Sequence, residues 1–312
     1  MNIAFGAGAI SKSSKKRIVT IGIFDGVHRG HQRLIQKVVS RAQAIKGVSI
    51  VFTFYPHPYH ILKPRTYLPL LISLTHRLQL IRSLGVDACV VQPFTERFSA
   101  LGAKKFIEEV VVKKLHPHEI YVGSDFSFGR DRHGDITLLK SLALKHNFTV
   151  KLIVPVKIAR AVISSTCVRT FIRSGDLRKA QRFLGRTVSV IGTVVRGSRR
   201  GRILGYPTAN IDCGAEVVPP LGVYAVKIIL KDNAYYGMAN IGTRPSFKHK
   251  KPKITVEVHI FRFKQSIYGK VVEIEFLQKI RDEKRFSSKA ALITQIRKDA
   301  VRVVSILRRF KR

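Results

Sequence analysis

The chain has 312 residues, and 57 Lys and Arg against 19 Asp and Glu give it a formal net charge of +38. With 45% hydrophobic and 24% charged residues it lies near the globular average of ~45–50% and ~25%, which excludes a disordered chain and a fibrous repeat, and its length suits two domains of roughly 100–200 residues each. No apolar run approaches the ~20 residues that a membrane-spanning helix needs, and the wide separation of the cysteines excludes a disulfide framework or a structural zinc site.

The N-terminal stretch lacks the order of a secretory signal. Apolar residues at 3–10 come before a basic cluster at 12–17, whereas a signal peptide places its positive charge first. We therefore expect a cytoplasmic protein whose first residues form an irregular leader ahead of the first strand. Lys and Arg are scattered along the chain, with a denser group at its end, so the charge alone selects no partner.

The first half of the chain alternates short β-rich runs with amphipathic helical stretches. This βαβ rhythm predicts a mainly parallel sheet with helices on both faces. In the helix expected over 32–45, for example, Leu34, Ile35, Val38 and Val39 share one face. We expect strands at 17–23, 48–54, 87–91, 119–122 and 149–154, and helices at 32–45, 75–84, 103–115 and 136–146.

The pattern changes near residue 185. Beyond it, short runs at 188–195, 223–230, 255–261 and 271–276 are separated by Gly, Pro and Asn turns. Such spacing predicts a small antiparallel β-barrel, closed by one terminal helix at 289–307. A basic helical segment at 175–185 would be the hinge between the two halves.

The first segment that carries chemistry, residues 22–31, lies between the first strand and the first helix. Backbone N–H groups and the helix dipole favour anions at such a position, and Gly22 and Gly30 allow close approach. His28 and His31 fall on one face of the opening helical turn and could both donate to a triphosphate. A plain turn with two surface histidines, or half of a metal site, are the alternatives; the combined pattern favours phosphate.

A hydroxyl run, Ser164, Ser165 and Thr166, is followed by Arg169. Hydroxyls at a helix start accept from backbone N–H groups, while those N–H groups and an arginine fork can clamp a polyphosphate. Taken alone, the run is better explained as simple helix capping.

The loop 123–129 follows a strand and combines a carboxylate, Asp125, with the rings of Phe126 and Phe128. This combination suits a flat heterocycle. A packed loop without a ligand is the alternative.

The glycine- and arginine-rich segment 196–210 is the main candidate in the second half. Thr208 and Asn210 offer two neutral oxygens to a hard divalent cation that keeps waters and nucleotide phosphates as its other ligands. The Walker pattern is absent, and a basic surface hairpin is the simpler interpretation of the segment alone.

Glu257 lies in the alternating segment 255–261, where Val256, Val258 and Ile260 face one side and Glu257 the other. A carboxylate fixed on a strand is a plausible general base for a hydroxyl nucleophile. An exposed Glu opposite a core face is the alternative.

Together these segments resemble the bifunctional bacterial riboflavin kinase/FMN adenylyltransferases, also called FAD synthetases. The resemblance runs from residue 17 to about residue 304, with the motifs in family order. The matching segments are 22–31, 53–58, 122–134, 163–169, 192–210, 220–224, 240–245, 257–259, 268–269 and 280–283.

The resemblance implies a Rossmann-like nucleotidyltransferase domain at 1–185 and a riboflavin kinase β-barrel with a terminal helix at 186–312, both using ATP and Mg²⁺. The kinase would convert riboflavin to FMN, and the adenylyltransferase would convert FMN to FAD and pyrophosphate. Small molecules are thus the expected partners, without a membrane or a specific nucleic acid.

The resemblance also implies roles for individual residues. Glu257 would be the kinase base, Thr208 and Asn210 would help to hold Mg²⁺ and nucleotide, and His28 and His31 would bind the triphosphate in the other reaction. Ser164, Ser165, Thr166 and Arg169 would form the opposite wall of that site, and Asp125, Phe126 and Phe128 its flavin side. The remaining expected binding residues are Gly22, Phe24, Asp25, Gly30, Gly197, Gly201, Arg202, Gly205 and Pro207.

The sequence departs from the family pattern in two segments and at one single residue. Ser246-Phe247-Lys248 replaces the usual Thr and Phe-Gly after Arg-Pro, and the loop 261–266 is basic where acidic residues are common. Arg77 stands where a lysine is typical, which we interpret as a minor change.

Two other classes of protein fit parts of the pattern. One is a single-activity flavin enzyme with one decayed domain, although both motif sets look complete. The other is a basic nucleic-acid-binding protein, for which the charge is the only support, since no binding module with interleaved aromatics is present.

Overall fold

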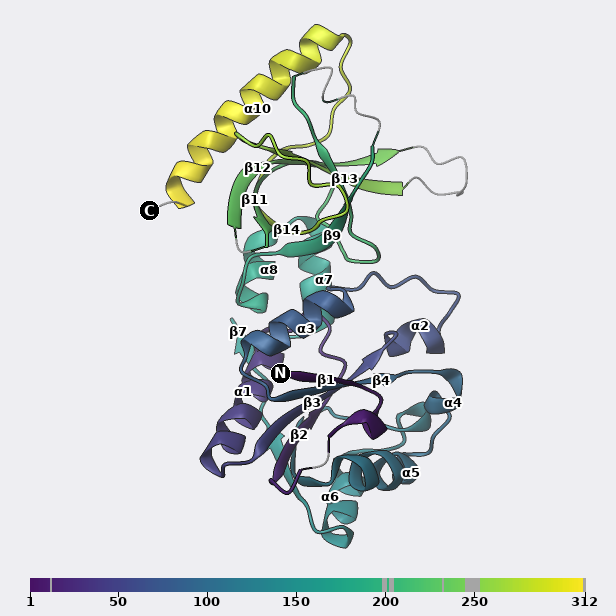
Figure 1. Ribbon diagram of the computed structural model, residues 1–312. Helices are drawn as coiled ribbons and strands as arrows, with labels where there is room; N and C mark the ends of the chain where they lie inside the picture. The colour runs from purple at the N-terminus through teal and green to yellow at the C-terminus, as the bar shows by residue number, and fades with distance from the viewer. Residues whose placement is uncertain (12, 198–200, 202–204, 232, 245–252, 311–312) are drawn as a thin grey trace. The chain divides into compact units, whose positions relative to one another are not determined.

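The computed structural model describes residues 1–11, 13–197, 201, 205–231, 233–244 and 253–310. The chain forms two compact units (Figure 1). The first contains Met1–Leu70 and Leu74–Ser165, and the second contains Leu71–Ser73 and Thr166–Arg312.

The first unit is built on a six-stranded parallel sheet. Its central strands are almost entirely buried, as expected for a parallel sheet covered on both faces. The predicted α/β class is confirmed. In spatial order the strands are β1 (Asn2–Phe5), β4 (Ala88–Pro93), β3 (Val48–Tyr55), β2 (Arg17–Ile21), β5 (Pro117–Gly123) and β6 (Thr149–Ile153).

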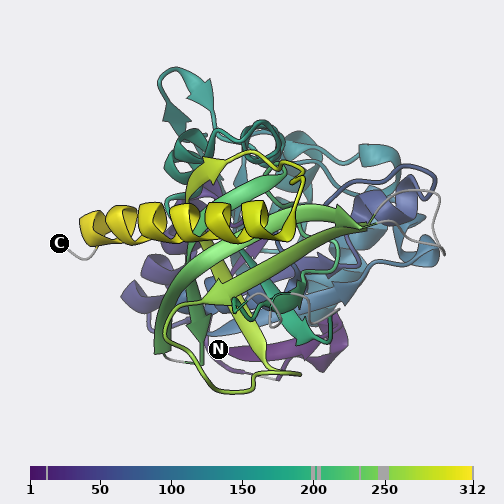
Figure 2. The same ribbon diagram turned by 90° about the horizontal axis from the view of Figure 1, so that it is seen from above.

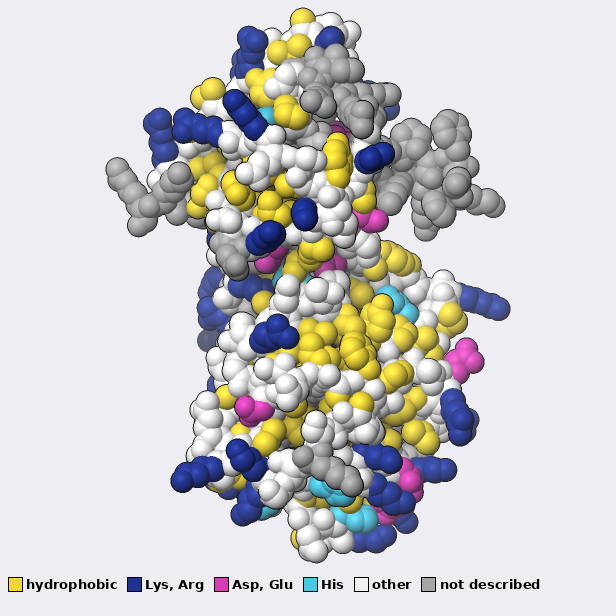
Figure 3. All heavy atoms as spheres, viewed as in Figure 1, with side chains coloured by type: hydrophobic (Ala, Val, Ile, Leu, Met, Phe, Trp, Pro, Cys, Tyr) yellow, Lys and Arg dark blue, Asp and Glu magenta, His cyan; other side chains and the backbone are white. Residues whose placement is uncertain are grey.

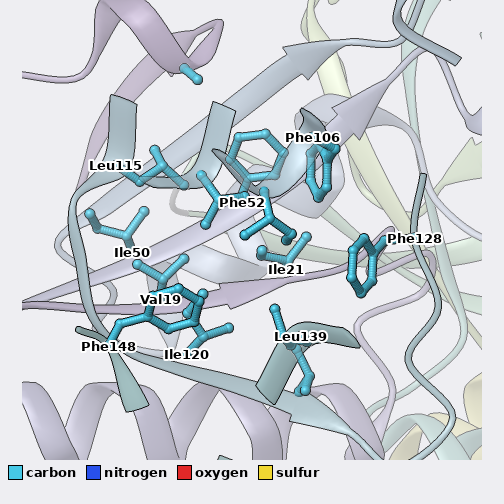
Figure 4. Packing of buried hydrophobic residues seen from close by; sticks show 14 of the residues in the cluster. Val19, Ile21, Ile50, Phe52, Phe106, Leu115, Ile120, Phe128, Leu139 and Phe148 are labelled. Atoms are coloured by element: carbon cyan, nitrogen blue, oxygen red, sulfur yellow. The ribbon is translucent and has the colours of Figure 1, made fainter. Parts of the chain in front are cut away.

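Helices lie on both faces of this sheet (Figures 1 and 2). Val19, Ile50 and Phe52 pack on one face against Phe106 and Leu139, as Figure 4 shows. Helix α1 (Arg29–Ala44) buries the predicted apolar stripe against the sheet. The remaining helical segments are η1 (Ala7–Ala9), α2 (Pro58–Leu62), α3 (Leu74–Ser83), α4 (Glu96–Ser99), α5 (Ala103–Lys105), η2 (Phe106–Leu115), η3 (Arg130–Arg132) and α6 (Ile136–Lys145), and a hairpin joins β7 (Lys157–Ile158) to β8 (Ala161–Val162).

The expectation of an irregular N-terminal leader is wrong. Residues Asn2–Phe5 form β1, a parallel edge strand on β4. Backbone hydrogen bonds from Asn2 N to Asp87 O (2.7 Å) and from Gly6 N to Val91 O (2.9 Å) fix its two ends. An edge strand needs only one neighbour and no long apolar run, so its own sequence gives a weak signal.

Two predicted boundaries also shift. Strand β2 ends at Ile21, before Gly22, and α1 begins at Arg29 because His28 caps it. The helix expected over 103–115 is α5 continued by η2, and η2 has π-helical hydrogen bonding.

The order of the strands places a topological switch point beside β2. From β2 the chain moves to β3 and β4 on one side and later returns to β5 on the other side of β2. In open α/β sheets, ligands bind at the carboxyl ends of the strands at such a point. The segments 22–31 and 124–129 follow the carboxyl ends of β2 and β5.

The second unit contains a closed antiparallel barrel. The predicted barrel is confirmed, and the alternation along β13 buries Val256, Val258 and Ile260 as expected. Around the barrel the strands are β10 (Ala209–Asp212), β13 (Lys253–Ile260), β12 (Asn233–Arg244), β11 (Gly222–Leu230), β14 (Val271–Arg281) and β9 (Ser189–Val195).

Three helices whose full length is described lie wholly or mainly in the second unit. They are α7 (Ser165–Ser174), α8 (Leu177–Leu184) and α10 (Lys289–Phe310), the predicted terminal helix. Figure 2 shows α10, in yellow, lying across the barrel, where Val303, Ile306 and Leu307 pack on Val223 and Ala225. The structural division falls at Ser165–Thr166, earlier in the chain than the expected functional boundary at 185.

A buried ion pair fastens α10 to the barrel. Arg281 on β14 donates from Nε and Nη2 to Asp299 Oδ2, both at 2.9 Å, and Gln295 Nε2 donates to Asp299 Oδ1 at 2.8 Å. The Asp299 side chain is 4% exposed. Its removal would leave Arg281 without its charged partner in a largely buried position.

We expect Asp299→Ala to lower the free energy of unfolding by about 3 kcal/mol, because breaking a buried ion pair leaves the other charge without its partner. Urea unfolding followed by circular dichroism measures the change. Asp282→Ala is the matched control, because its side chain is 88% exposed in an ion pair with Lys279, and it should unfold nearly as the parent does. Equal unfolding of the two variants would contradict the anchoring role of Asp299.

Candidate active sites

The turn after β2 has an unusual backbone. Phe24 has φ 53° and Val27 has φ 39°, which is the left-handed region and costly for a β-branched residue. Val27 N donates to Phe24 O at 3.2 Å, and Gln32 Nε2 donates to Val27 O at 2.8 Å. Strain of this kind is typical of functional loops, so the turn is the first candidate site.

Two glycines in this turn make room for rings. A Cβ at Gly22 would lie 2.9 Å from the Phe24 ring, and a Cβ at Gly30 would lie 3.2 Å from the His28 ring. Phe24 is 1% exposed and Asp25 is 2% exposed, so their side chains support the turn from beneath. Phe24 can therefore meet a ligand through its backbone only.

His28 and His31 form a stacked pair. Their ring centroids are 3.6 Å apart at 18°, and the rings of His31 and Phe24 form a T-shaped pair with centroids 5.2 Å apart. His28 Nδ1 accepts from His31 N at 3.3 Å and caps α1. Burial, then the charges of His28 and Arg77, lower the pKa of His31 well below its usual value, so His31 is neutral near pH 7. Its Nδ1 has no hydrogen-bond partner among the described residues.

The hydroxyl run reaches this turn through Ser165. Ser165 Oγ donates to Asp25 O at 2.8 Å, and Ser164 immediately precedes it. Thr166 and Arg169 follow along α7, in the part of that helix that belongs to the second unit. The structure thus places Ser165 against the turn, whereas the resemblance implied only that the hydroxyl run forms the opposite wall of that site.

The loop after β5 provides the aromatic side of the first unit. Phe126 and Phe128 stack with centroids 5.3 Å apart, and Asp125 is exposed beside them. Phe128 is 6% exposed and packs on Phe106, so it is mainly a core residue. Phe126 is therefore the ring of this pair with more surface to offer.

In the second unit, three polar side chains lie in one row. In the antiparallel register Glu257 on β13 is opposite Asn210 on β10 and opposite Asn240 on β12. Directly opposed residues share a face with Cβ atoms roughly 4.5–5.5 Å apart. This face is the one opposite Val256 and Val258, and Glu257 is half-buried in it.

Glycines form a cradle beside this row. A Cβ at Gly197 would lie 2.1 Å from Asn210 Nδ2, and a Cβ at Gly201 would lie 2.4 Å from Tyr206 O and 3.1 Å from Thr208 Oγ1. The cradle and its neutral oxygens fit a Mg²⁺ ion that is carried by a nucleotide, because this ion keeps most of its waters and phosphate ligands. The described residues contain no acidic or histidine cluster that would form a separate metal cage.

Contacts to β13 hold the end of the 196–210 segment. His259 Nδ1 and Pro207 O are 2.8 Å apart, and the rings of Tyr206 and His259 form a T-shaped pair with centroids 5.4 Å apart. Gly205 has φ 80°, which favours glycine. Arg202 and the substituted 246–248 segment lie outside the described residues.

Two family models match this chain, one in each half. The family model for FAD synthetase matches residues 10–167, and the model for riboflavin kinase matches residues 184–307. The chain is 38% identical to the bifunctional riboflavin kinase/FMN adenylyltransferase of Buchnera aphidicola from Acyrthosiphon pisum and 35% identical to that of Bacillus subtilis, in each case over 96% of both chains. The chain belongs to the bifunctional riboflavin kinase/FMN adenylyltransferase family.

Members of this family are transferases of flavin cofactor biosynthesis. A solved structure named Macrolide-efflux Protein, from Streptococcus pneumoniae, shares the fold of this chain at 30% identity and a TM-score of 0.82, over 95% of this chain and 96% of that one. Within the described residues, no helix has the length and apolar character to cross a membrane.

Sequence reasoning assigned no role to several residues at these sites. Asn240 joins the Glu257 row only through strand pairing, which no local pattern reveals. In the first unit, Phe54, Phe94 and Phe98 form an aromatic group at the carboxyl end of β3 and β4, with centroids 5.7–6.1 Å apart. The segment 53–58 is part of the resemblance, but no role was assigned to the Phe54 ring within it.

Proposed function

We propose that this chain catalyses two successive reactions. Residues 186–312 transfer the γ-phosphate of ATP to riboflavin, and residues 1–185 transfer the adenylyl group of a second ATP to FMN. The observation that carries this proposal is that the candidate groups of the two reactions lie in separate segments of the chain, 22–31, 125–128 and 164–169 for the adenylyl transfer and 197–210 and 257 for the phosphorylation. The FAD synthetase model, which matches residues 10–167, covers most of the first set, and the riboflavin kinase model, which matches residues 184–307, covers the second set.

In the kinase reaction, Glu257 accepts the proton of the ribityl 5′-hydroxyl while that oxygen attacks the γ-phosphorus and ADP leaves. A neutral hydroxyl is a poor nucleophile, so a positioned base contributes directly. Asn210 and Asn240 flank Glu257 in the strand register and would orient it and the nucleotide. Thr208 and Asn210 would hold Mg²⁺, which supplies charge neutralisation to the phosphates.

In the adenylyl transfer, a phosphate oxygen of FMN attacks the α-phosphorus of ATP and pyrophosphate leaves. A phosphate monoester is largely ionised near neutral pH, since its second pKa is ~6, so no base is needed. His28 and His31 donate to the triphosphate from the start of α1, where backbone N–H groups and the helix dipole also favour an anion. Gly22 and Gly30 leave room for the rings of Phe24 and His28 in this turn.

The flavin side of that site is proposed at the loop after β5. Asp125 and Phe126 lie there, and the group formed by Phe54, Phe94 and Phe98 adds rings at the same edge of the sheet. Aromatic faces suit the isoalloxazine ring.

We further propose that the protein is cytoplasmic and has no specific nucleic-acid partner. Its cysteines form no disulfide among the described residues, which fits a reducing compartment. On the face shown in Figure 3, Lys and Arg side chains are spread over both units and form no single patch.

One assay tests the proposed function. Purified protein receives riboflavin, ATP and Mg²⁺, and chromatography follows FMN, FAD and pyrophosphate. FMN supplied in place of riboflavin isolates the second reaction. Formation of FAD from FMN without formation of FMN from riboflavin, or the reverse, would limit the chain to one activity.

Gly197→Ala should lower riboflavin phosphorylation by roughly 10–100-fold, because a misplacement of about 1 Å can cost that much. A Cβ at this position would lie 2.1 Å from Asn210 Nδ2 and would push the amide out of its place. FAD formation from supplied FMN is the internal control and should not change. An unaltered kinase rate would contradict the role of Asn210.

A further inference from the structure

Arg77 on α3 is among the most deeply buried side chains of the first unit, with 1% of its surface exposed. Its Nη1 donates to Ile23 O (2.7 Å), Thr53 Oγ1 (3.0 Å) and Phe54 O (3.1 Å). Ile23 follows β2, and the other two acceptors lie near the end of β3. One guanidinium nitrogen therefore joins the carboxyl ends of the two strands.

These contacts fix the peptide group that opens the 22–31 turn. Ile23 O accepts from Arg77 and also from Thr53 Oγ1 at 3.0 Å, so its direction is set from two sides. The N–H of a trans peptide points opposite to its carbonyl, so the direction of Phe24 N–H is set as well. Phe24 N has no hydrogen-bond partner among the described residues, so this donor is not used within the described part of the fold.

Arg77 also brings a positive charge to the turn. Burial lowers the pKa of Arg77, while Asp25, Cys89 and Tyr55 raise it, and the side chain stays charged. The charges that act on His31 are those of His28 and Arg77, and both lower its pKa after the larger effect of burial. A buried charge at this place is costly for folding, and its presence therefore favours a functional role for Arg77.

We propose that Arg77 is a positioning residue for adenylyl transfer, which aims the Phe24 N–H at the ATP triphosphate and adds a buried positive charge beneath it. This inference rests on the proposed adenylyltransferase function. The alternative is a purely structural brace between β2 and β3.

The test compares Arg77→Met, Arg77→Lys and Arg82→Met in the full chain. Arg77→Met should raise the KM for ATP in FAD formation by about 10–100-fold, as expected for a lost hydrogen-bonded charge, with the KM for FMN and riboflavin phosphorylation unchanged. Arg77→Lys keeps the charge and three donors and should restore much of the loss. Arg82→Met removes an exposed charge from the same helix and should behave as the parent does.

A second measurement does not depend on activity. The NMR titration of the His31 ring should show a higher pKa of His31 in Arg77→Met than in the parent protein, because Arg77 is one of the charges that lower this pKa. Arg82→Met should leave the pKa of His31 unchanged. An unchanged KM for ATP with an unchanged His31 titration would overturn the proposal in favour of the brace. If Arg77→Met does not fold, Arg77→Gln replaces it, since it also lacks the charge.

Failure of the proposed adenylyltransferase function would give a result different from failure of the role proposed for Arg77. The parent protein would then make no FAD from FMN, while the His31 titration would still decide whether Arg77 acts on the turn.

Discussion

Glu257→Gln should abolish most riboflavin phosphorylation and leave FAD formation from supplied FMN unchanged. The amide keeps the size of the side chain and its place between Asn210 and Asn240, but it cannot accept the proton of the ribityl hydroxyl. General-base catalysis is typically worth roughly 10²–10⁴ in rate, so the kinase rate should fall by that factor. The two half-reactions are measured separately after circular dichroism has confirmed folding.

Glu275→Gln is the matched control for this experiment. Glu275 is a half-buried carboxylate on β14 of the same barrel, 3.5 Å from Lys227 Nζ. Its replacement should leave both reactions near their parent rates. A kinase rate in Glu257→Gln equal to that in Glu275→Gln would show that another group is the base, even though the family assignment stands.

The architecture of both units could be predicted because its signals are local. Strands β2 to β5 are buried on both faces, so their sequences are short apolar runs. The apolar residues of α1 recur every three or four positions. Short strands such as β1 and β10 carry no such signal, because a neighbouring strand supplies the stabilising hydrogen bonds. The leader at 1–10 was therefore assigned wrongly.

The sites were predictable only as far as their residues are close in sequence. His28, which caps α1, and His31 are three residues apart, so their closeness on one face follows from spacing, although the stacking of their rings does not. The meeting of Asn210, Glu257 and Asn240 depends on strand register, and the link from Arg77 to Ile23 and Phe54 depends on how α3 packs. The arginine at position 77 was interpreted as a minor change, whereas the structure shows that its side chain is buried, which the sequence alone does not reveal.

His31→Ala should lower FAD formation from supplied FMN by roughly 10²–10³, the typical value of one preorganised donor to developing charge. His31 stacks on His28 and forms a T-shaped pair with Phe24, so the alanine also leaves the His28 ring less well supported. Riboflavin phosphorylation should continue near its parent rate, because its groups lie in the barrel and share no partner with His31.

His118→Ala provides the comparison for this loss. His118 is on β5 with 37% of its side chain exposed, near the start of the strand and therefore at the opposite end from the ligand-binding edge. Its replacement should alter neither reaction. Because His31 is already neutral near pH 7, its loss should lower the rate of FAD formation by a similar factor between pH 7 and pH 8, whereas a protonated His31 would make the loss fade as the pH rises. A loss confined to the kinase reaction, or a loss that disappears at the higher pH, would contradict the role of His31 as a neutral donor to the triphosphate.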